Sequence, residues 1–244
     1  MDFTEIKTSE ELRIHLNAPY VNTIKNNIYH YTSLRSLYEI FKNKSIRFSK
    51  LAVMNDVIEM KFAENCSDYF FCLSKEPCGV ECFGMWSMYG KLAEFCKEKA
   101  PEKIGVKIQF SKEIIDNLRN ENVLAFHSVA YLNKENGQCF LGSQKNNNHI
   151  PIEQDVLAGY IKDGCWKYEN EYRLRKTAES SKTRIGVPIS DTLLKDLIVY
   201  PSPVSTVEEC EKLFRKLEKE YGRVSIFPNF QQNSYEGTFS VHLK

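Results

Sequence analysis

The segment YENEYRLRK places two carboxylates and a guanidinium at every second position, as Glu169, Glu171 and Arg173. Residues 168 to 176 have the period-two pattern of a half-buried β-strand, and alternate side chains of a strand share one face. Two carboxylates in one cleft raise the pKa of one of them, which suits it to act as a general base. The pattern also fits a solvated strand face on which an arginine pairs across strands. Both interpretations stay open at this point.

A histidine stands in the aromatic segment NIYHYT, residues 27 to 32, which favours a β-strand. His30 and Thr32 share one face of that strand. A lone histidine among aromatic residues is more often a satisfied, half-buried side chain than a functional group. The pattern alone therefore gives His30 no chemical role.

Metal binding is not expected. The four other histidines show no metal-ligand spacing, and the eight cysteines contain no C-x-x-C motif. Several cysteines lie in apolar strings, so we interpret them as buried free thiols of a protein in a reducing compartment.

Several helices with capping residues are expected to position these groups. Thr8 or Ser9 caps a helix over residues 8 to 17 with Glu11 as its reciprocal partner, and Ser33 and Ser111 cap two more. Further helices are predicted over residues 55 to 66, 83 to 100 and 206 to 222. In the first of these, we interpret Asn55, Asp56 and Glu59 as a cap with a capping-box carboxylate.

Strands are predicted between these helices, over residues 46 to 51, 67 to 76, 105 to 110, 126 to 132, 168 to 176, 184 to 190, 194 to 201 and 224 to 230. Helices and strands mix without a steady βαβ rhythm, which favours an α+β fold with a largely antiparallel sheet. We expect a single domain over residues 1 to 244, with KNNNH at 145 to 149 as a surface loop. Gly-rich phosphate loops are missing, so Rossmann dehydrogenases and P-loop ATPases fit poorly.

The composition limits the partners. The formal net charge is +1, from 33 basic and 32 acidic residues, so the chain lacks the excess of positive charge that drives non-specific nucleic-acid binding. Aromatic residues make up 12% and could stack on bases. The N-terminus has no apolar signal region and no run of about 18 apolar residues occurs. We expect a soluble, cytoplasmic protein with no membrane partner.

Six phrases together carry a resemblance to a known family. They are YHYTS (29 to 33), IRFSKLAVMNDVIE (46 to 59), FFCLS (70 to 74), MWSMYG (85 to 90), GVKIQF (105 to 110) and WKYENEYRL (166 to 174). In this order they resemble a widespread bacterial family described as a domain of unknown function, over roughly residues 28 to 240. That family in turn resembles ADP-ribosyltransferases, especially DNA-targeting toxins with an H-[YF]-T strand.

The resemblance implies an ADP-ribosyltransferase-like fold, with a split, mainly antiparallel sheet, and NAD as substrate. His30 would bind a ribose hydroxyl, with Tyr31 and Thr32 beside it. Glu171 would be the catalytic carboxylate near the nicotinamide ribose, where positive charge develops, and Glu169 would orient the nucleophile.

Weaker assignments follow from the same resemblance. Ser49 or Tyr89 would hold or stack on nicotinamide. Arg173 would bind the NAD phosphates, or would pair with a glutamate and hold it in place. Because an exposed strand position tolerates change at under about 0.5 kcal/mol, we expect Glu171→Gln to leave the fold intact. Trp86 and Trp166 are interpreted as core residues.

The resemblance thus implies an NAD-dependent ADP-ribosyltransferase, a toxin or anti-phage effector that modifies a nucleic acid, DNA or RNA, or a protein, and that a cognate antitoxin would restrain. The alternatives are an NAD glycohydrolase that uses the same site, and a catalytically inactive module that binds a nucleotide or a protein.

Overall fold

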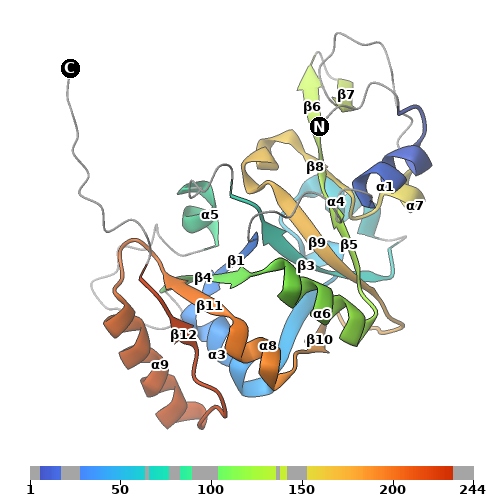
Figure 1. The fold of residues 1–244 in the computed structure, drawn as a ribbon. Coiled ribbons are helices and arrows are strands. Elements are labelled where there is room, and N and C mark those ends of the chain that lie inside the picture. The colour runs from blue at the N-terminus through green and yellow to red at the C-terminus, as the bar shows by residue number, and fades with distance from the viewer. Residues whose placement is uncertain are drawn as a thin grey trace, which may run out of the picture. The chain divides into compact units, whose positions relative to one another are not determined.

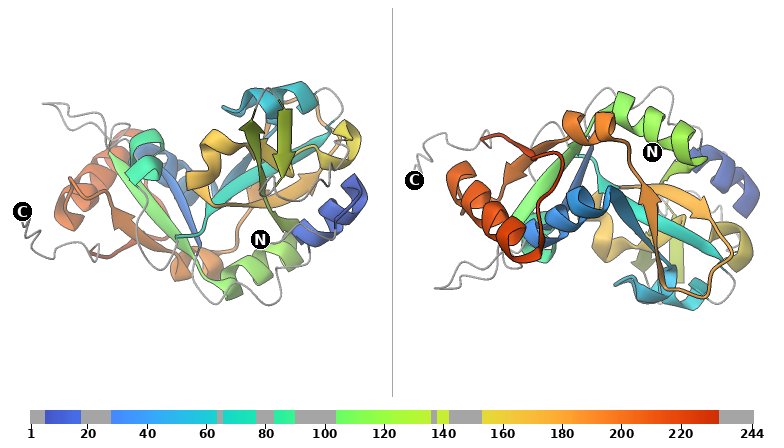
Figure 2. Two further views of the ribbon diagram at one scale, coloured as in Figure 1. Left: turned by 90° about the horizontal axis from the view of Figure 1, so that it is seen from above. Right: turned by 90° about the horizontal axis from the view of Figure 1, so that it is seen from below.

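The chain forms two compact units, each with its own strands and helices. The computed structural model describes residues 6–17, 28–63, 66–76, 83–89, 104–135, 138–141 and 153–232. The first unit comprises Met1–Ile28, Ile46–Glu81 and Ser111–Pro188, and the second comprises Tyr29–Ser45, Cys82–Phe110 and Ile189–Lys244. Figures 1 and 2 show the elements. Helices alternate irregularly with mainly antiparallel strands, so the α+β prediction is confirmed.

The main sheet of the first unit has the strand order β10-β2-β3-β9-β5. Its strands are β2 (Ser45–Ser49), β3 (Asp68–Ser74), β5 (Ala125–Ser128), β9 (Glu171–Thr177) and β10 (Arg184–Pro188). Strand β9 lies between β3 and β5 and is antiparallel to both. Ser74 of β3 stands opposite Glu171, and Cys72 stands opposite Arg173. The first residues of β9 are therefore enclosed on both sides by hydrogen-bonded neighbours.

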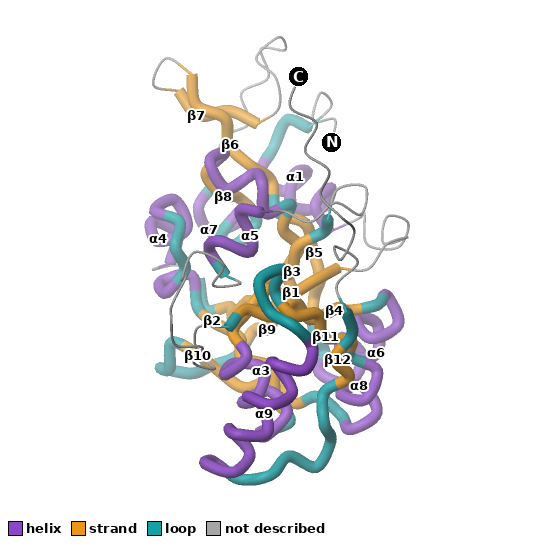
Figure 3. The backbone as a smooth tube through the Cα atoms, turned by 90° about the vertical axis from the view of Figure 1, so that its left-hand side faces the viewer, coloured by secondary structure: helices purple, strands orange, loops and turns teal. Residues whose placement is uncertain are grey.

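A smaller sheet of the first unit has the order β7-β6-β8. Its strands are β6 (Ala130–Glu135), β7 (Gln138–Leu141) and β8 (Ile161–Asp163), with β8 parallel to β6. The helical elements of this unit are α1 (Ser9–Asn17), η1 (Leu51–Val53), α4 (Val57–Phe62), α6 (Lys112–Asn122), α7 (Gln154–Leu157) and η4 (Gly164–Glu169). Figure 3 distinguishes helices from strands.

The apolar core of the first unit joins these two sheets. Leu12 and Leu16 of α1 are fully enclosed, and they belong to one cluster with Phe70 of β3, Leu157 of α7 and Ile161 of β8. Helix α1 presents its apolar face at i, i+4 spacing, which is the pattern expected for a helix that covers a core. This packing brings β8 and its Lys162 beside the main sheet.

The second unit contains β1 (Ile28–Ser33), β4 (Gly105–Phe110), β11 (Ile198–Pro201) and β12 (Asn229–Phe230), in the order β1-β4-β11-β12. Its helices are α3 (Leu34–Asn43), α5 (Phe83–Met88), α8 (Asp191–Asp196) and α9 (Val207–Tyr221). Phe214 of α9 packs edge-on against Tyr38 and Phe41 of α3, and also against Phe227 and Phe230. Aromatic edge-to-face contacts thus hold α9 in place.

Helix starts follow the capping residues that the sequence predicted. Thr8 Oγ1 accepts from the Glu11 backbone N–H, and Glu11 Oε2 accepts from the Thr8 N–H, both at 3.1 Å. Ser33 and Ser111 each accept from a backbone N–H three residues on. The three predicted caps are confirmed.

Several predicted boundaries are wrong. Helix α4 is shorter than residues 55 to 66, and residues 191–196 form a helix ahead of a shorter strand. The predicted strand 126 to 132 is two strands, β5 and β6, which belong to different sheets. The expected loop at 145 to 149 and the predicted helix beyond residue 89 lie outside the described residues.

Candidate functional site

Five charged side chains of the first unit meet beside β9 and form the charge cluster: Glu59, Lys162, Glu169, Glu171 and Arg173. They come from α4, β8, η4 and β9. Each is 4% exposed or less. Charged side chains are almost never this buried unless they are paired, so the cluster requires a specific role in structure or chemistry.

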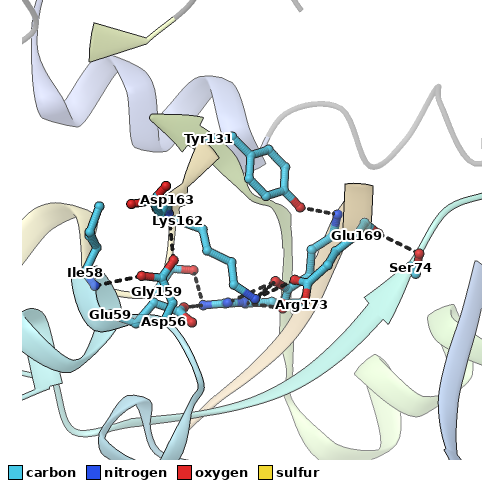
Figure 4. Close-up of polar contacts among 11 residues, drawn as sticks. Asp56, Ile58, Glu59, Ser74, Tyr131, Gly159, Lys162, Asp163, Glu169 and Arg173 are labelled. Carbon is cyan, nitrogen blue, oxygen red and sulfur yellow. Dashed lines mark hydrogen bonds and ion pairs between the residues drawn. The ribbon is translucent and has the colours of Figure 1, made fainter. Parts of the chain in front are cut away.

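Lys162 joins the two acids of the E-x-E motif. Its Nζ lies 2.5 Å from Glu169 Oε2 and 3.1 Å from Glu171 Oε2. Burial acts to lower the pKa of Lys162, but the attraction of the carboxylates outweighs it and the pKa is raised well above its usual value. Lys162 therefore carries its charge at neutral pH. Figure 4 shows its ammonium group reaching the carboxylates of the neighbouring elements.

Arg173 holds Glu171 from the other side. Its Nε donates to Glu171 Oε1 at 2.8 Å and its Nη2 donates to Glu171 Oε2 at 3.1 Å, a bidentate pair. Nη1 donates to the backbone oxygen of Gly159 at 3.0 Å and lies 2.5 Å from Glu59 Oε1. Arg173 is fully enclosed, so its guanidinium acts as an internal anchor.

Gly159 allows this anchor to form. Its φ is +80°, and an added Cβ would lie 2.3 Å from the ring of Phe70. Only glycine fits such a turn without strain or displacement of the ring. The sequence thus places a glycine where the backbone must approach Phe70 and turn its oxygen to Arg173.

The Glu171 carboxylate is ionised. Burial acts to raise its pKa, but Arg173 and Lys162 together outweigh burial and hold the pKa far below the usual range. Its backbone N–H donates to the Tyr131 hydroxyl at 2.7 Å. Tyr131 is half-buried, and its own O–H has no hydrogen-bond acceptor among the described residues. This phenol is therefore a hydrogen-bond donor beside the carboxylate.

The charge cluster contains three carboxyl groups but two cations, and Glu59 is the third carboxyl group. Burial raises its pKa, an effect that the nearby Arg173 opposes without cancelling. Although Glu59 Oε1 lies close to Arg173, neither carboxyl oxygen forms a hydrogen bond of good geometry with the described residues. Of Glu59 and Glu171, Glu59 is the one that we expect to take up a proton first.

Three further hydrogen bonds fix the elements that carry the cluster. Asp56 caps α4 by accepting from the Ile58 N–H at 2.7 Å, and it also accepts from the Asp163 N–H at 2.6 Å. The predicted Asp56 cap is confirmed, whereas Glu59 turns to Arg173 instead of closing a capping box. Ser74 Oγ donates to the backbone oxygen of Glu169 at 2.5 Å.

A second buried polar group lies beside the cluster. His127 of β5 stands opposite Arg173 and stacks on Tyr160 at 4.1 Å between ring centroids. Its Nδ1 donates to the Ser128 backbone oxygen at 3.1 Å, and its Nε2 has no hydrogen-bond partner among the described residues. Burial lowers the pKa of His127 to about 3. The ring is therefore neutral at physiological pH.

The prediction that Glu169 and Glu171 share a strand is wrong. Strand β9 begins at Glu171, and Glu169 ends the 3-10 helix η4. Asn170 between them is left-handed, with φ +43°. The two carboxylates nevertheless meet at Lys162, because this turn directs Glu169 to the same ammonium group.

The expected exposure of the motif is also wrong. Glu169 and Glu171 are each 3% exposed, so the solvated strand face is ruled out and Glu171→Gln cannot be a mild surface change. Of the two roles considered for Arg173, the pairing with a glutamate is present. Ser49, at the end of β2, is half-buried and lies opposite Phe70 of β3.

The other predicted site residues belong to the second unit. His30 and Thr32 are half-buried on β1, and Tyr89 is half-buried directly after α5. Tyr31 is 4% exposed and packs edge-on against Trp86, so it belongs to the core. Trp86 is 1% exposed, as a core residue should be.

Lys162 and Tyr131 were not predicted from the sequence, and Glu59 was assigned to a cap. Lys162 directly follows the apolar string LAGYI, and a lysine at the end of such a string was the available signal. Tyr131 gave no signal, because tyrosine is common in strands.

The described part of the chain shows neither a metal-binding group nor a disulfide. There, no group of three or more His, Cys, Asp or Glu side chains is arranged to hold a metal ion. Cys66, Cys72, Cys165 and Cys210 are free thiols; Cys210 is buried, whereas Cys165 is exposed, contrary to the expectation for buried cysteines. In the same part of the chain, every helix is too short or too polar to span a bilayer.

Comparison with known proteins gives no relative: no family model, no curated protein and no solved structure matches the chain. The chemistry of the charge cluster therefore carries the functional proposal.

Proposed function

We propose that this protein is an NAD-dependent ADP-ribosyltransferase with Glu171 as the carboxylate beside the nicotinamide ribose. The supporting observation is the convergence of Glu169 and Glu171 on Lys162, with Glu171 held ionised by Arg173. Cleavage of the bond between nicotinamide and ribose develops positive charge on the ribose. A fixed carboxylate in a site that excludes water stabilises such charge strongly, because it needs no reorganisation during the reaction.

The proposed roles follow from the contacts. Glu171 offsets the positive charge of the ribose, and Glu169 orients the acceptor nucleophile. Tyr131 donates its free O–H to a substrate oxygen near Glu171. The resemblance of the sequence motifs, and no contact in the structure, adds His30 and Thr32 as proposed contacts to the other ribose, and Ser49 and Tyr89 as proposed contacts to nicotinamide. Arg173 positions Glu171 and does not bind the phosphates.

Catalysis requires the ribose to reach a carboxylate that Lys162 and Arg173 now occupy. A hydroxyl must come within about 3 Å of a Glu171 oxygen to interact with it. Lys162 is shared between Glu171 and Glu169, so it can leave Glu171 and stay paired with Glu169. We therefore expect NAD binding to displace Lys162 from Glu171 towards Glu169.

The remaining parts of the proposal rest on the resemblance of the sequence motifs. They are an ADP-ribosyltransferase-like arrangement of the α+β fold, a role as a toxin or anti-phage effector, an acceptor that is DNA, RNA or protein, and control by a cognate antitoxin. The observed mixture of helices and mainly antiparallel strands is compatible with that fold.

A second candidate function is a catalytically inactive binding module. It is favoured by the near-complete burial and pairing of Glu169 and Glu171, since a closed ion cluster can serve structure alone. An NAD glycohydrolase, with water as nucleophile, would use the proposed catalytic site unchanged.

One assay separates these functions. The full chain is incubated with NAD labelled on the adenylate and, separately, on nicotinamide, together with DNA, RNA or lysate protein. Transfer of adenylate label supports the proposal; release of nicotinamide without transfer indicates a glycohydrolase. If a folded sample gives neither product, the enzymatic proposal is rejected.

A matched pair of variants assigns the activity to the cluster. Glu171→Asp keeps the charge but withdraws the carboxylate, so transfer should fall by orders of magnitude, as expected for loss of transition-state stabilisation. Glu179→Gln removes an exposed carboxylate of the same unit and should leave transfer unchanged. Thermal melting of both variants verifies that the folded fraction is the same. Full activity of Glu171→Asp would argue against a catalytic Glu171.

A further inference from the structure

A hollow of about 420 Å³ lies at the C-terminal end of α9 in the second unit, and its lining includes Arg215, Glu218, Lys219, Arg223, Val224, Ser225 and Phe227. This volume is within the range of about 300–1,000 Å³ that is typical of small-molecule sites. We refer to it as the basic hollow. No residue of the charge cluster or of the predicted NAD contacts lines it.

The basic hollow has an excess of positive charge. Its one acid, Glu218, is 9% exposed and already paired: Oε2 accepts from Arg215 at 3.2 Å and Oε1 accepts from the Val224 N–H at 3.1 Å. Lys219 and Arg223 are exposed, and neither has an acidic partner within 4 Å among the described residues. Two unpaired cations therefore remain to receive an anion.

An aromatic face accompanies these cations. The Arg215 guanidinium lies 4.1 Å from the centroid of the Phe227 ring. Phe227 is held in turn by edge-on contacts with Phe214 and Phe230 of the aromatic core. The ring is thus held by its neighbours, whereas the Arg215 side chain is exposed, and both are groups on which a nucleic-acid base can stack.

The same cations have a simpler explanation, because positive side chains near a helix C-terminus stabilise the helix dipole. That explanation accounts for Lys219 in the last turn of α9, but not for the other features. Arg223 lies beyond the end of the helix, and stabilisation of the helix dipole requires neither a hollow nor an aromatic ring in its lining. Cations around an aromatic surface are the combination that binds single-stranded nucleic acid.

We propose that the basic hollow binds a nucleotide unit of a single-stranded nucleic acid, with its phosphate at Lys219 and Arg223 and its base on the Arg215–Phe227 stack. The binding involves neither NAD nor the charge cluster, so it stands independently of the transferase proposal. A free mononucleotide also carries a phosphate and a base, so it could occupy the same hollow. The experiment below distinguishes it from a single strand by competition.

The test is the binding of fluorescently labelled oligothymidylate and oligouridylate to the full chain without NAD, followed by fluorescence anisotropy. The double variant Lys219→Ala/Arg223→Ala should weaken binding on the order of tenfold and reduce the slope of log affinity against log salt by about 0.7, the value for one neutralised phosphate of a single strand. The matched control Lys212→Ala/Lys216→Ala removes the same charge from exposed positions of α9 that do not line the hollow, and should change affinity less than about twofold.

Three results would overturn the proposal. The first is no binding of either strand at low salt, and the second is an equal loss of affinity in both double variants, which would assign binding to the general charge of α9. The third is competition by duplex DNA or by free mononucleotide as effective as competition by unlabelled strand. A failure of ADP-ribosyl transfer with strand binding intact would reject the transferase proposal alone.

Discussion

Lys162 pairs with Glu169 and also with one oxygen of Glu171, and all three side chains are buried. Its removal would break both of these buried ion pairs. Loss of one member of a buried ion pair costs about 3–5 kcal/mol. We therefore expect Lys162→Met to lower the free energy of unfolding by about that amount in urea titrations.

The control for this substitution is Lys167→Met. Lys167 lies five positions further on, in η4, and it is exposed. A surface change of this kind stays within about 0.5 kcal/mol. If Lys162→Met were as stable as the control, Glu169 would have to be neutral or hydrated, and the cluster would not need its lysine.

Glu59 and Glu171 should respond differently to the same neutralisation. Neither carboxyl oxygen of Glu59 forms a hydrogen bond of good geometry with the described residues, and Arg173 keeps its bidentate pair with Glu171 when Glu59 is neutralised. Glu59→Gln should therefore cost less than about 1 kcal/mol. Glu171→Gln removes the bidentate partner of Arg173 and should cost about 3–5 kcal/mol. Urea unfolding of the two variants at neutral pH measures the difference. Equal losses would show that Glu59 is ionised as well as Glu171.

At the scale of elements, the turn between η4 and β9 decides where the two motif carboxylates point. Asn170 has φ +43°, and its Nδ2 donates to the Lys75 backbone oxygen at 2.7 Å. Asn170→Gly keeps the left-handed backbone and loses one hydrogen bond, about 1 kcal/mol. Asn170→Val adds β-branched strain and should cost about 1–3 kcal/mol more.

The comparison between the two Asn170 variants is made by thermal or urea unfolding. A valine variant as stable as the glycine variant would mean that the turn relaxes to another conformation. In that case the 3-10 helix would not set the position of Glu169.

The sequence predicted those elements whose signals are local. The caps at Thr8, Ser33 and Ser111 were found because each depends on residues within three positions. The η4 turn was missed because its residues 168 to 171 also fit the alternation of a strand. Burial of Glu171 and Arg173 was missed because an alternating charged pattern is normally solvent-exposed, and their partners Lys162 and Glu59 come from separate segments.

At the scale of the whole molecule, His127 should make stability depend on pH. Its pKa falls from 6.5 to about 3 on folding, so the unfolded chain binds a proton more readily than the folded one. The stabilisation is complete above pH 6.5 and is lost as the pH falls towards 3. Between about pH 7 and pH 5, the free energy of unfolding should drop by about 2 kcal/mol from this group.

Urea unfolding of wild type and His127→Phe over that interval tests the assignment. The variant should lose most of the drop, whereas His15→Gln on α1 should keep it. This window lies above the ordinary pKa of glutamate, so the low pKa of Glu171 contributes little there. An unchanged pH dependence in His127→Phe would assign the effect to other groups.

The charge cluster also affects how the first unit unfolds. Its members come from α4, β8, η4 and β9, and detaching any one of these elements would take a partner away from a buried charge. Local opening is thereby penalised, so the four elements should separate together or not at all. The amide protons of Asp163 and Glu171, donated to Asp56 and Tyr131, are the reporters: in native-state hydrogen exchange they should be replaced by deuterium only through the same opening event, at a common rate.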